Sequence, residues 1–86
     1  MKSIAAPSFW RLYRELTAEA RIHAKKAYRL FMENPDHPSL RFKKLQGYPN
    51  MWSVRFGRDG RVVGVREGET IVWQWIGTHQ DFDNQF

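Results

Sequence analysis

The chain has 86 residues and a formal net charge of +5, which is enough sequence for one small domain with a modest core. It has no cysteine, which excludes disulfides, thiolate nucleophiles and cysteine-based zinc sites, and its three histidines are too scattered to suggest a metal cluster. No apolar run approaches the roughly 20 residues of a membrane span and no signal-peptide pattern is present, so we expect a single cytoplasmic domain over residues 1–86 with no metal, cofactor or membrane partner.

Residues 7–34 predict two helices that follow each other directly. Pro7 suits the first turn of a short amphipathic helix, whose apolar residues are Phe9, Trp10, Leu12, Tyr13 and Leu16. Thr17 is a suitable N-cap for a second helix, which Asn34 and Pro35 end. Alanines recur on the apolar face of the second helix, so we expect it to pack closely on the first helix and on a sheet.

The opposite side of the second helix is basic, with Arg21, Lys25, Lys26 and Arg29. The simplest interpretation is a solvated helix face, and a second contact to nucleic acid is the alternative.

From Leu40 the apolar residues recur at every second position, which is typical of strands. The pattern predicts four strands between about residues 40 and 77. The turns between the later strands carry glycine, as tight hairpins require: Asp59-Gly60 and Glu67-Gly68. Consecutive hairpins give an antiparallel meander, so the expected fold is α+β, with an N-terminal helical hairpin packed on one face of a four-stranded antiparallel sheet.

The other face of this sheet is expected to be open. If the large apolar residues of the segment 52–56 point toward the helices, the intervening Ser53 and Arg55 point away from them. Lys43 and Arg61 then lie on the same open face. Two helices can cover only one face, so these four side chains are available to a ligand.

Positive charge is concentrated in this sheet. Seven of the fourteen lysine and arginine residues lie between Arg41 and Arg66, where Asp59 is the one carboxylate. A basic sheet face suggests a polyanion, most simply nucleic acid, and the plain alternative is a solvated basic surface. Besides the residues of the open face that carry chemistry, the RNA-binding candidates are Arg41, Lys44, Ser53, Arg58 and Arg66.

Trp73 and Trp75 are two positions apart in the last expected strand, so they are predicted to share one face of the sheet. Packing in the core is the favoured interpretation. The alternative is that they stack on bases or on a protein partner.

The order of motifs along the chain resembles the RelE/ParE superfamily of bacterial type II toxins. The segments that carry the resemblance are Leu45-Gln46-Gly47, then Trp52-Ser53-Val54-Arg55-Phe56-Gly57, Arg61-Val62-Val63 and Trp75-Ile76-Gly77-Thr78-His79. The resemblance implies a toxin that is silenced by a cognate antitoxin. It further implies either cleavage of mRNA in the ribosomal 30S A site or, in the ParE branch, inhibition of DNA gyrase.

Site residues carry over from the family with some substitutions. Arg61 matches the arginine set against the scissile phosphate, and Arg55 stands where a related member has a catalytic lysine. His79 aligns with a histidine or arginine of cleaving members. Lys43 stands where one branch has a glutamate base, and Ser53 replaces a lysine of another branch. The tyrosine often found near the C-terminus is missing, and no first strand is visible before the first helix.

The chemistry of metal-free RNA cleavage fits these residue types. It requires a base for the 2′-hydroxyl proton, cations for the pentavalent phosphate and an acid for the leaving 5′-oxygen. Arg55 and Arg61 suit the cationic role because guanidinium binds phosphate in a bidentate manner, and His79 suits proton transfer. Lys43 is a base only if it is neutral, and otherwise it is a further electrostatic clamp. The plain alternatives are a solvated sheet face for the arginines and a surface or capping role for His79.

The leading hypothesis is a toxin that cleaves ribosome-bound mRNA without a metal ion. The alternative is a ParE-like gyrase inhibitor, or a degenerate toxin that only binds an antitoxin. The arginine pair and His79 favour cleavage, whereas the missing tyrosine favours the alternative.

Overall fold

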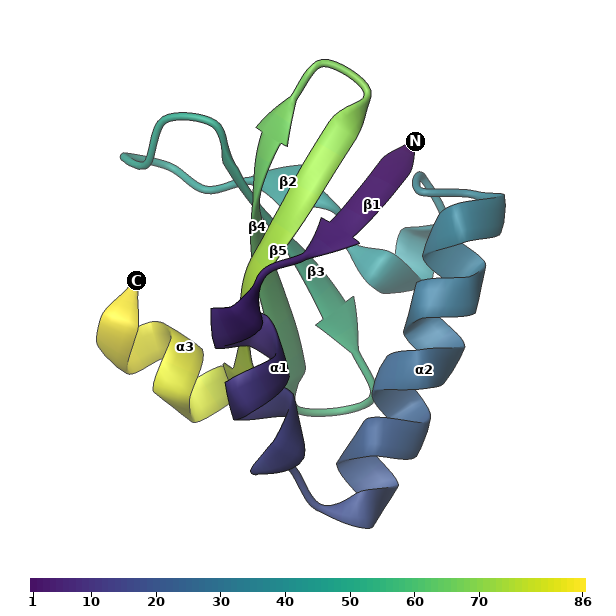
Figure 1. Cartoon of the computed structure of the whole chain (residues 1–86), viewed down its shortest axis with the longest axis vertical. Helices are drawn as coiled ribbons and strands as arrows, with labels where there is room; N and C mark the ends of the chain where they lie inside the picture. Colours follow the sequence, from purple (N-terminus) through teal and green to yellow (C-terminus); the bar gives the residue numbers. More distant parts are fainter.

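The computed structural model describes residues 1–86 as a five-stranded mixed sheet with helices on both faces (Figure 1). The strands are β1 (Lys2–Ala5), β2 (Lys43–Lys44), β3 (Met51–Phe56), β4 (Gly60–Glu67) and β5 (Thr70–Thr78). The helices are α1 (Pro7–Arg14), α2 (Ala18–Glu33), the short 3-10 helix η1 (Pro38–Leu40) and α3 (His79–Gln85). The strand order across the sheet is β1-β5-β4-β3-β2.

The antiparallel part of the fold follows the expectation, but the sheet has one more strand than predicted. Strands β2 to β5 form antiparallel pairs, whereas β1 lies parallel to β5 at the other edge, with Lys2 opposite Thr70 and Ala5 opposite Trp73. The prediction of a purely antiparallel four-stranded sheet is therefore wrong. The four residues of β1 alternate too briefly to be recognised, and pairing with β5 supplies the backbone hydrogen bonds that make them a strand.

The expected first strand at Leu40 is also wrong, because Leu40 ends η1. Pro38 fits the first turn of a helix, the His37 side chain accepts a hydrogen bond from the Ser39 N–H, and Arg41 adopts a left-handed φ of 46°. The chain therefore turns before the short β2. Leu40 still becomes a core residue, with 1% of its surface exposed.

The main core lies between the sheet and the first two helices. Its most buried members are Phe31, Leu40, Val54, Ile71 and Trp73. The N-cap predicted for α2 is confirmed, since the Thr17 hydroxyl accepts from the Ala20 N–H at 3.1 Å. The two helices contact different strands, α1 packing on β5 and α2 on β3, so they leave a groove between them.

An irregularity in β5 separates the two tryptophans. Val63 lies opposite Trp75 and Gly64 opposite Trp73, so Gln74 is an extra residue in the ladder. Its carbonyl accepts a hydrogen bond from the Ser8 hydroxyl at 2.8 Å. The prediction that Trp73 and Trp75 share a face is therefore wrong, because the bulge turns Trp73 into the core and Trp75 to the opposite face.

The opposite face is covered in part by α3, which the sequence pattern did not predict. Phe82 of α3 and Phe86, which follows the helix, contact the Trp75 ring, with centroid distances of 6.3 and 5.5 Å, and the Tyr48 ring lies 5.7 Å from that of Phe86. Val63, beside Trp75, is fully buried as a result. The expected open face is therefore open only where the ends of β3 and β4 extend beyond this aromatic cluster.

Candidate functional site

Arg55 and Arg61 lie directly opposite each other on β3 and β4. Both are half-buried, and residues at opposed positions of an antiparallel pair point to the same face. The register of the hairpin thus places two arginine side chains at neighbouring positions on one face. The hairpin turn at Asp59-Gly60, which the sequence predicted, connects these two strands.

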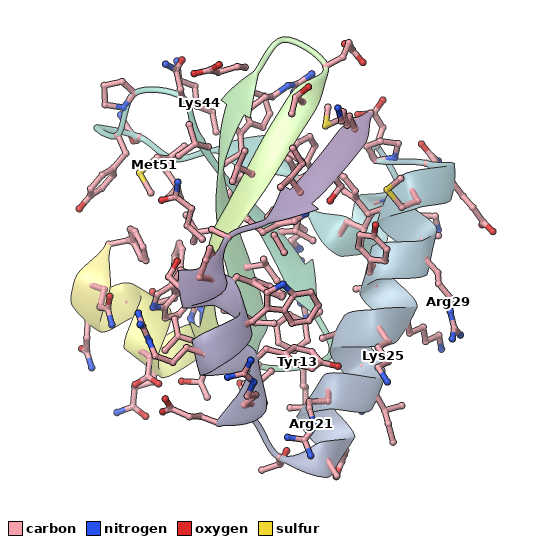
Figure 2. The ribbon with its side chains drawn as sticks, in the orientation of Figure 1. Tyr13, Arg21, Lys25, Arg29, Lys44 and Met51 are labelled. Carbon is pink, nitrogen blue, oxygen red and sulfur yellow. The ribbon has the colours of Figure 1, made fainter.

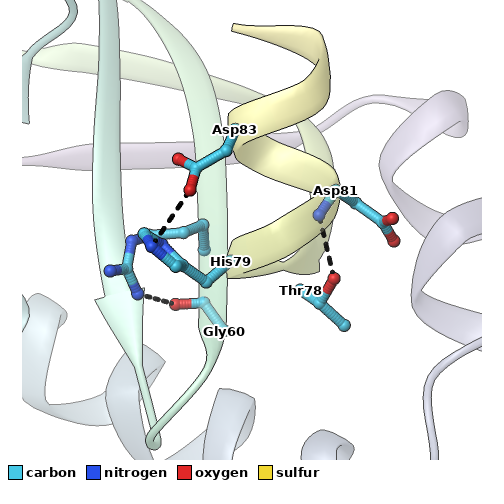
Figure 3. A network of polar contacts seen from close by, with 6 residues as sticks. Gly60, Thr78, His79, Asp81 and Asp83 are labelled. Atoms are coloured by element: carbon cyan, nitrogen blue, oxygen red, sulfur yellow. Dashed lines mark hydrogen bonds and ion pairs between the residues drawn. The ribbon is translucent and has the colours of Figure 1, made fainter.

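The surroundings of Arg61 make it an electropositive centre. Burial is the main cause that lowers the pKa of Arg61, and repulsion from Arg55 and Arg41 lowers it further, while Asp83 and Asp59 oppose the shift. Arg61 Nη1 donates to the carbonyl oxygen of Gly60 at 2.8 Å, which fixes the side chain close to the sheet (Figure 3). An anion bound at this point relieves the repulsion among the arginines.

His79 is the first residue of α3 and lies at the same end of the sheet. Gly77, two residues before it, pairs with Arg61, and the His79 backbone N–H donates to the Asp59 carbonyl oxygen. Its imidazole Nε2 lies 3.2 Å from Oδ2 of Asp83, one helical turn further on (Figure 3). The imidazole is about half exposed, with a relative side-chain exposure of 48%. A titratable group and a cationic pair therefore share one corner of the molecule.

The start of α3 is fixed by a capping interaction. The Thr78 hydroxyl accepts from the Asp81 N–H at 3.1 Å, which places Thr78 as N-cap (Figure 3). This signal is present in the sequence as a threonine followed three residues later by an aspartate, with aromatic residues at 82 and 86 for the apolar side. Sequence reasoning missed both the helix and Asp83.

Lys43 lies on the arginine side of the sheet but at its edge. It pairs with Ser53, which shares its face with Arg55 two residues further along β3. Its side chain is exposed. Lys43 is therefore a neighbour of Arg55 that approaches the site from the outermost strand.

Two of the predicted RNA-binding residues, Ser53 and Arg66, are not exposed on the face that carries Arg55 and Arg61. Ser53 is 3% exposed, because it lies opposite the buried Val63 beneath the aromatic cover, so its side chain cannot contact RNA. Arg66 lies over the rings of Trp52 and Phe42, at 4.6 and 5.5 Å from their centroids, on the side of the sheet that faces α2. Ser53 is buried because its face is partly covered, and Arg66 lies on the other face because it is an odd number of residues from Arg61 along β4.

The remaining basic candidates are exposed, but Lys44 lies on the face of the sheet that carries Trp52, away from the arginine pair. Arg41 follows η1 and contributes to the field at Arg61. Arg58 lies in the turn between β3 and β4, and Lys44 pairs with Trp52 at the edge of the sheet. Of these residues, Arg41 is the one whose charge lowers the pKa of Arg61.

A second concave surface lies on the opposite side, in the groove between α1 and α2. It has a volume of about 590 Å³ and is lined mainly by apolar residues of α1, α2 and the sheet, among them Phe9, Trp10, Tyr13, Ala24, Tyr28 and Val62. Trp10 and Tyr28 are each nearly half exposed. Figure 2 shows Tyr13 between the two helices, and Lys25 and Arg29 along α2. The groove is therefore a mainly apolar concave surface bordered by basic side chains of α2.

Arg21, one of the basic residues of α2, connects this helix to the end of α1. Its guanidinium donates to the carbonyl oxygens of Leu16, at 2.9 Å, and Arg14, at 3.2 Å, at the end of α1. It therefore fastens the helical hairpin (Figure 2).

No group of three or more histidine, cysteine, aspartate or glutamate side chains is arranged to hold a metal ion. None of the helices is both long and apolar enough to span a membrane.

Comparison with known proteins identifies relatives across nearly the whole chain. Residues 18–84 match the family model described as ParE-like toxin domain. No curated protein matches the sequence. Among solved structures, a chain of the RelB–RelE antitoxin–toxin complex from Methanococcus jannaschii is 19% identical with a TM-score of 0.76, over 96% of this chain and 98% of that one.

Two further structures share the fold. The YoeB/ParE toxin from Agrobacterium tumefaciens is 20% identical with a TM-score of 0.70, over 92% of this chain and 99% of that one. YafQ from E. coli is 14% identical with a TM-score of 0.71, over 94% and 96% of the two chains. At these identities the likeness concerns the fold.

Proposed function

This chain belongs to the ParE-like toxin domain family of the RelE/ParE superfamily, and we propose that it is the toxin of a type II toxin–antitoxin system that cleaves mRNA on the ribosome without a metal ion. The proposed place of action is the ribosomal 30S A site, in the cytoplasm. The observation that carries the proposal is the pair Arg55–Arg61 with His79 at the same end of the sheet.

The arginine pair supplies the charge stabilisation that the reaction needs. When the 2′-oxygen attacks phosphorus and the bond to the 5′-oxygen breaks, the phosphate passes through a state with extra negative charge. Arg55 and Arg61 are pre-arranged as two neighbouring forks, and a partly buried site strengthens their interaction with the phosphate oxygens. Lys43 and Arg41 extend this positive surface for the phosphates of the bound RNA.

His79 supplies proton transfer. Its imidazole takes up the 2′-hydroxyl proton and returns a proton to the leaving 5′-oxygen, which closes the proton balance of the cleavage. With His79 as the one proposed proton carrier beside the arginine pair, the rate depends strongly on how the RNA is held. A message already threaded through the ribosome meets that requirement through positioning.

The proposed partner is a cognate antitoxin. The similar structure from Methanococcus jannaschii is an antitoxin–toxin complex, and the charge of +5 favours an acidic or amphipathic segment that covers Arg55 and Arg61. Val63 lies on the same face as the arginines but is fully buried, so it cannot supply apolar contacts to the antitoxin. The groove between α1 and α2, with its exposed Trp10 and Tyr28, offers apolar surface for such a partner.

A second candidate is a ParE-like inhibitor of DNA gyrase, or a degenerate toxin that only binds an antitoxin. It is favoured by the residue after His79, which is Gln80, and by the absence of a tyrosine near the C-terminus. Such a protein needs no proton carrier beside the arginines.

Single-turnover cleavage of ribosome-bound mRNA by His79→Gln tests the proposal. Glutamine keeps hydrogen bonding but cannot carry a proton, so we expect a loss of about 10²-fold or more in rate with ribosome binding nearly unchanged. His23→Gln is the matched control, because His23 lies on α2 and pairs with Glu19. Equal rates for His79→Gln and wild type would reject His79 as the proton carrier.

A further inference from the structure

Asp83 is linked to both chemical components of the site. Its Oδ2 lies 3.2 Å from Nε2 of His79, and its charge acts on Arg61 against the combined effect of burial and the neighbouring arginines. No other carboxylate lies within ion-pair distance of His79. Asp83 is thus the one acidic side chain positioned to act on the imidazole.

The helix that carries Asp83 is held firmly against the sheet. The Thr78 cap and the bond from the His79 N–H to the Asp59 carbonyl fix its first turn. Phe82 and Phe86 fix its other side through their contacts with Trp75. Because His79 and Asp83 are four residues apart on this helix, their side chains meet on one face.

We propose that Asp83 is a positioning residue for His79. Its carboxylate accepts a hydrogen bond from the Nε2–H group, so the neutral imidazole carries its hydrogen on Nε2 and presents Nδ1 as the basic atom. This inference rests on the proposed function of His79 as proton carrier.

The proton path then has a defined sequence. Nδ1 takes the proton from the 2′-hydroxyl as the 2′-oxygen bonds to phosphorus, and the resulting imidazolium is stabilised by the Asp83 carboxylate. The same Nδ1 proton passes to the 5′-oxygen as its bond to phosphorus breaks. Asp83 keeps its charge throughout, and the imidazole ends as it began.

Asp83→Asn is the informative variant, with Asp81→Asn as its control. Each removes one negative charge from an exposed position of α3, but Asp83 lies beside His79 whereas Asp81 lies on the other side of the helix (Figure 3). An asparagine amide can donate to Nε2, which moves the imidazole proton to Nδ1 and places the basic atom on the wrong side of the ring.

The first measurement is the tautomer of His79 in the full-length ¹⁵N-labelled protein, read from long-range ¹H–¹⁵N imidazole correlations. We expect the Nε2–H tautomer in wild type and Asp81→Asn, and a large population of Nδ1–H in Asp83→Asn. The second is cleavage of ribosome-bound mRNA, where we expect Asp83→Asn to lower kcat about tenfold or more with little change in KM. Asp81→Asn should stay near the wild-type rate.

The two measurements separate the failure of this inference from the failure of the proposed function. An unchanged His79 tautomer in Asp83→Asn overturns the positioning role, whatever the cleavage assay shows. A changed tautomer with an unchanged kcat also overturns it. If the wild-type protein cuts no RNA, the proposed function fails, and the role of Asp83 in the reaction fails with it. Should Asp83→Asn not fold, as judged by circular dichroism, Asp83→Ala must lose the uniform Nε2–H tautomer, and a retained one rejects the inference.

Discussion

Two like charges at opposed positions of a hairpin are unfavourable for folding, and the arginine pair of this protein is such an arrangement. Arg55 and Arg61 face each other across β3 and β4, and the pKa of Arg61 is lowered by burial and by this repulsion. Directly opposed like charges weaken an antiparallel pair. Because the two arginines repel each other in the free protein, binding of an anion between them is expected to stabilise the folded state.

Substitution of Arg61 by glutamine should therefore separate stability from activity. Arg61→Gln keeps much of the side-chain stem and removes the repulsion, so we expect the free energy of unfolding to rise by about 0.2–1 kcal/mol. The rate of mRNA cleavage should fall by about 10²-fold or more, because one charge stabiliser is lost. Urea unfolding and single-turnover cleavage measure the two effects.

Arg66→Gln is the matched control on the same strand. Arg66 lies over Trp52 and Phe42 on the other side of the sheet, so its loss should lower stability by about 0.5–1 kcal/mol and leave cleavage unchanged. If both variants lose activity equally, the face occupied by Arg55 and Arg61 is not the reactive one.

Strand β5 is the element that organises the fold, because its bulge directs one tryptophan to each face. Gly64 lies opposite Trp73 at this irregularity. A Cβ atom built on Gly64 would lie 2.8 Å from the Trp73 ring, 2.9 Å from the Ile71 side chain and 2.9 Å from the Val72 carbonyl oxygen. Glycine is therefore required here by close approach of a neighbouring strand.

Gly64→Ala should destabilise the protein by about 1–3 kcal/mol, because backbone and core must both shift to admit one methyl group. The measurement is the midpoint of urea unfolding at unchanged slope. An unfolding midpoint equal to that of wild type would show that the backbone at the bulge can shift to admit the methyl group without loss of stability.

The groove between α1 and α2 gives a separate prediction at the level of elements. Trp10→Ala should weaken binding of the cognate antitoxin by about 10-fold or more, because large aromatic side chains dominate binding at apolar sites. Cleavage without antitoxin should be unchanged, since the groove lies away from Arg61. Titration calorimetry measures the first and mRNA cleavage the second.

Ile22→Ala serves as the control for this variant. Ile22 is the most exposed of the large apolar side chains, at 66%, and does not line the groove. Equal antitoxin affinity for Trp10→Ala and wild type would place the partner elsewhere on the molecule.

For the molecule as a whole, the sequence pattern predicted the features that depend on interactions between residues close together in the chain. The cap at Thr17, the hairpin at Asp59-Gly60 and the common face of Arg55 and Arg61 follow from turn chemistry and alternation, and the structure has all of them. Strand β1 and the cover provided by α3 depend on pairing and packing between distant parts of the chain. Short segments carry too little periodicity to reveal such contacts, so Ser53 was expected at the surface and Asp83 was overlooked.

The proposed function of the whole molecule is cleavage of RNA by Arg55, Arg61 and His79. The most direct test adds purified wild-type protein to ribosomes translating a defined message and maps new RNA ends by primer extension, with gyrase supercoiling assayed in parallel. We expect the wild-type protein to cut the message at A-site codons and the double variant Arg55→Gln/Arg61→Gln to leave it intact. Supercoiling by gyrase should be unaffected by the wild-type protein. An intact message together with arrested supercoiling would contradict the proposed function.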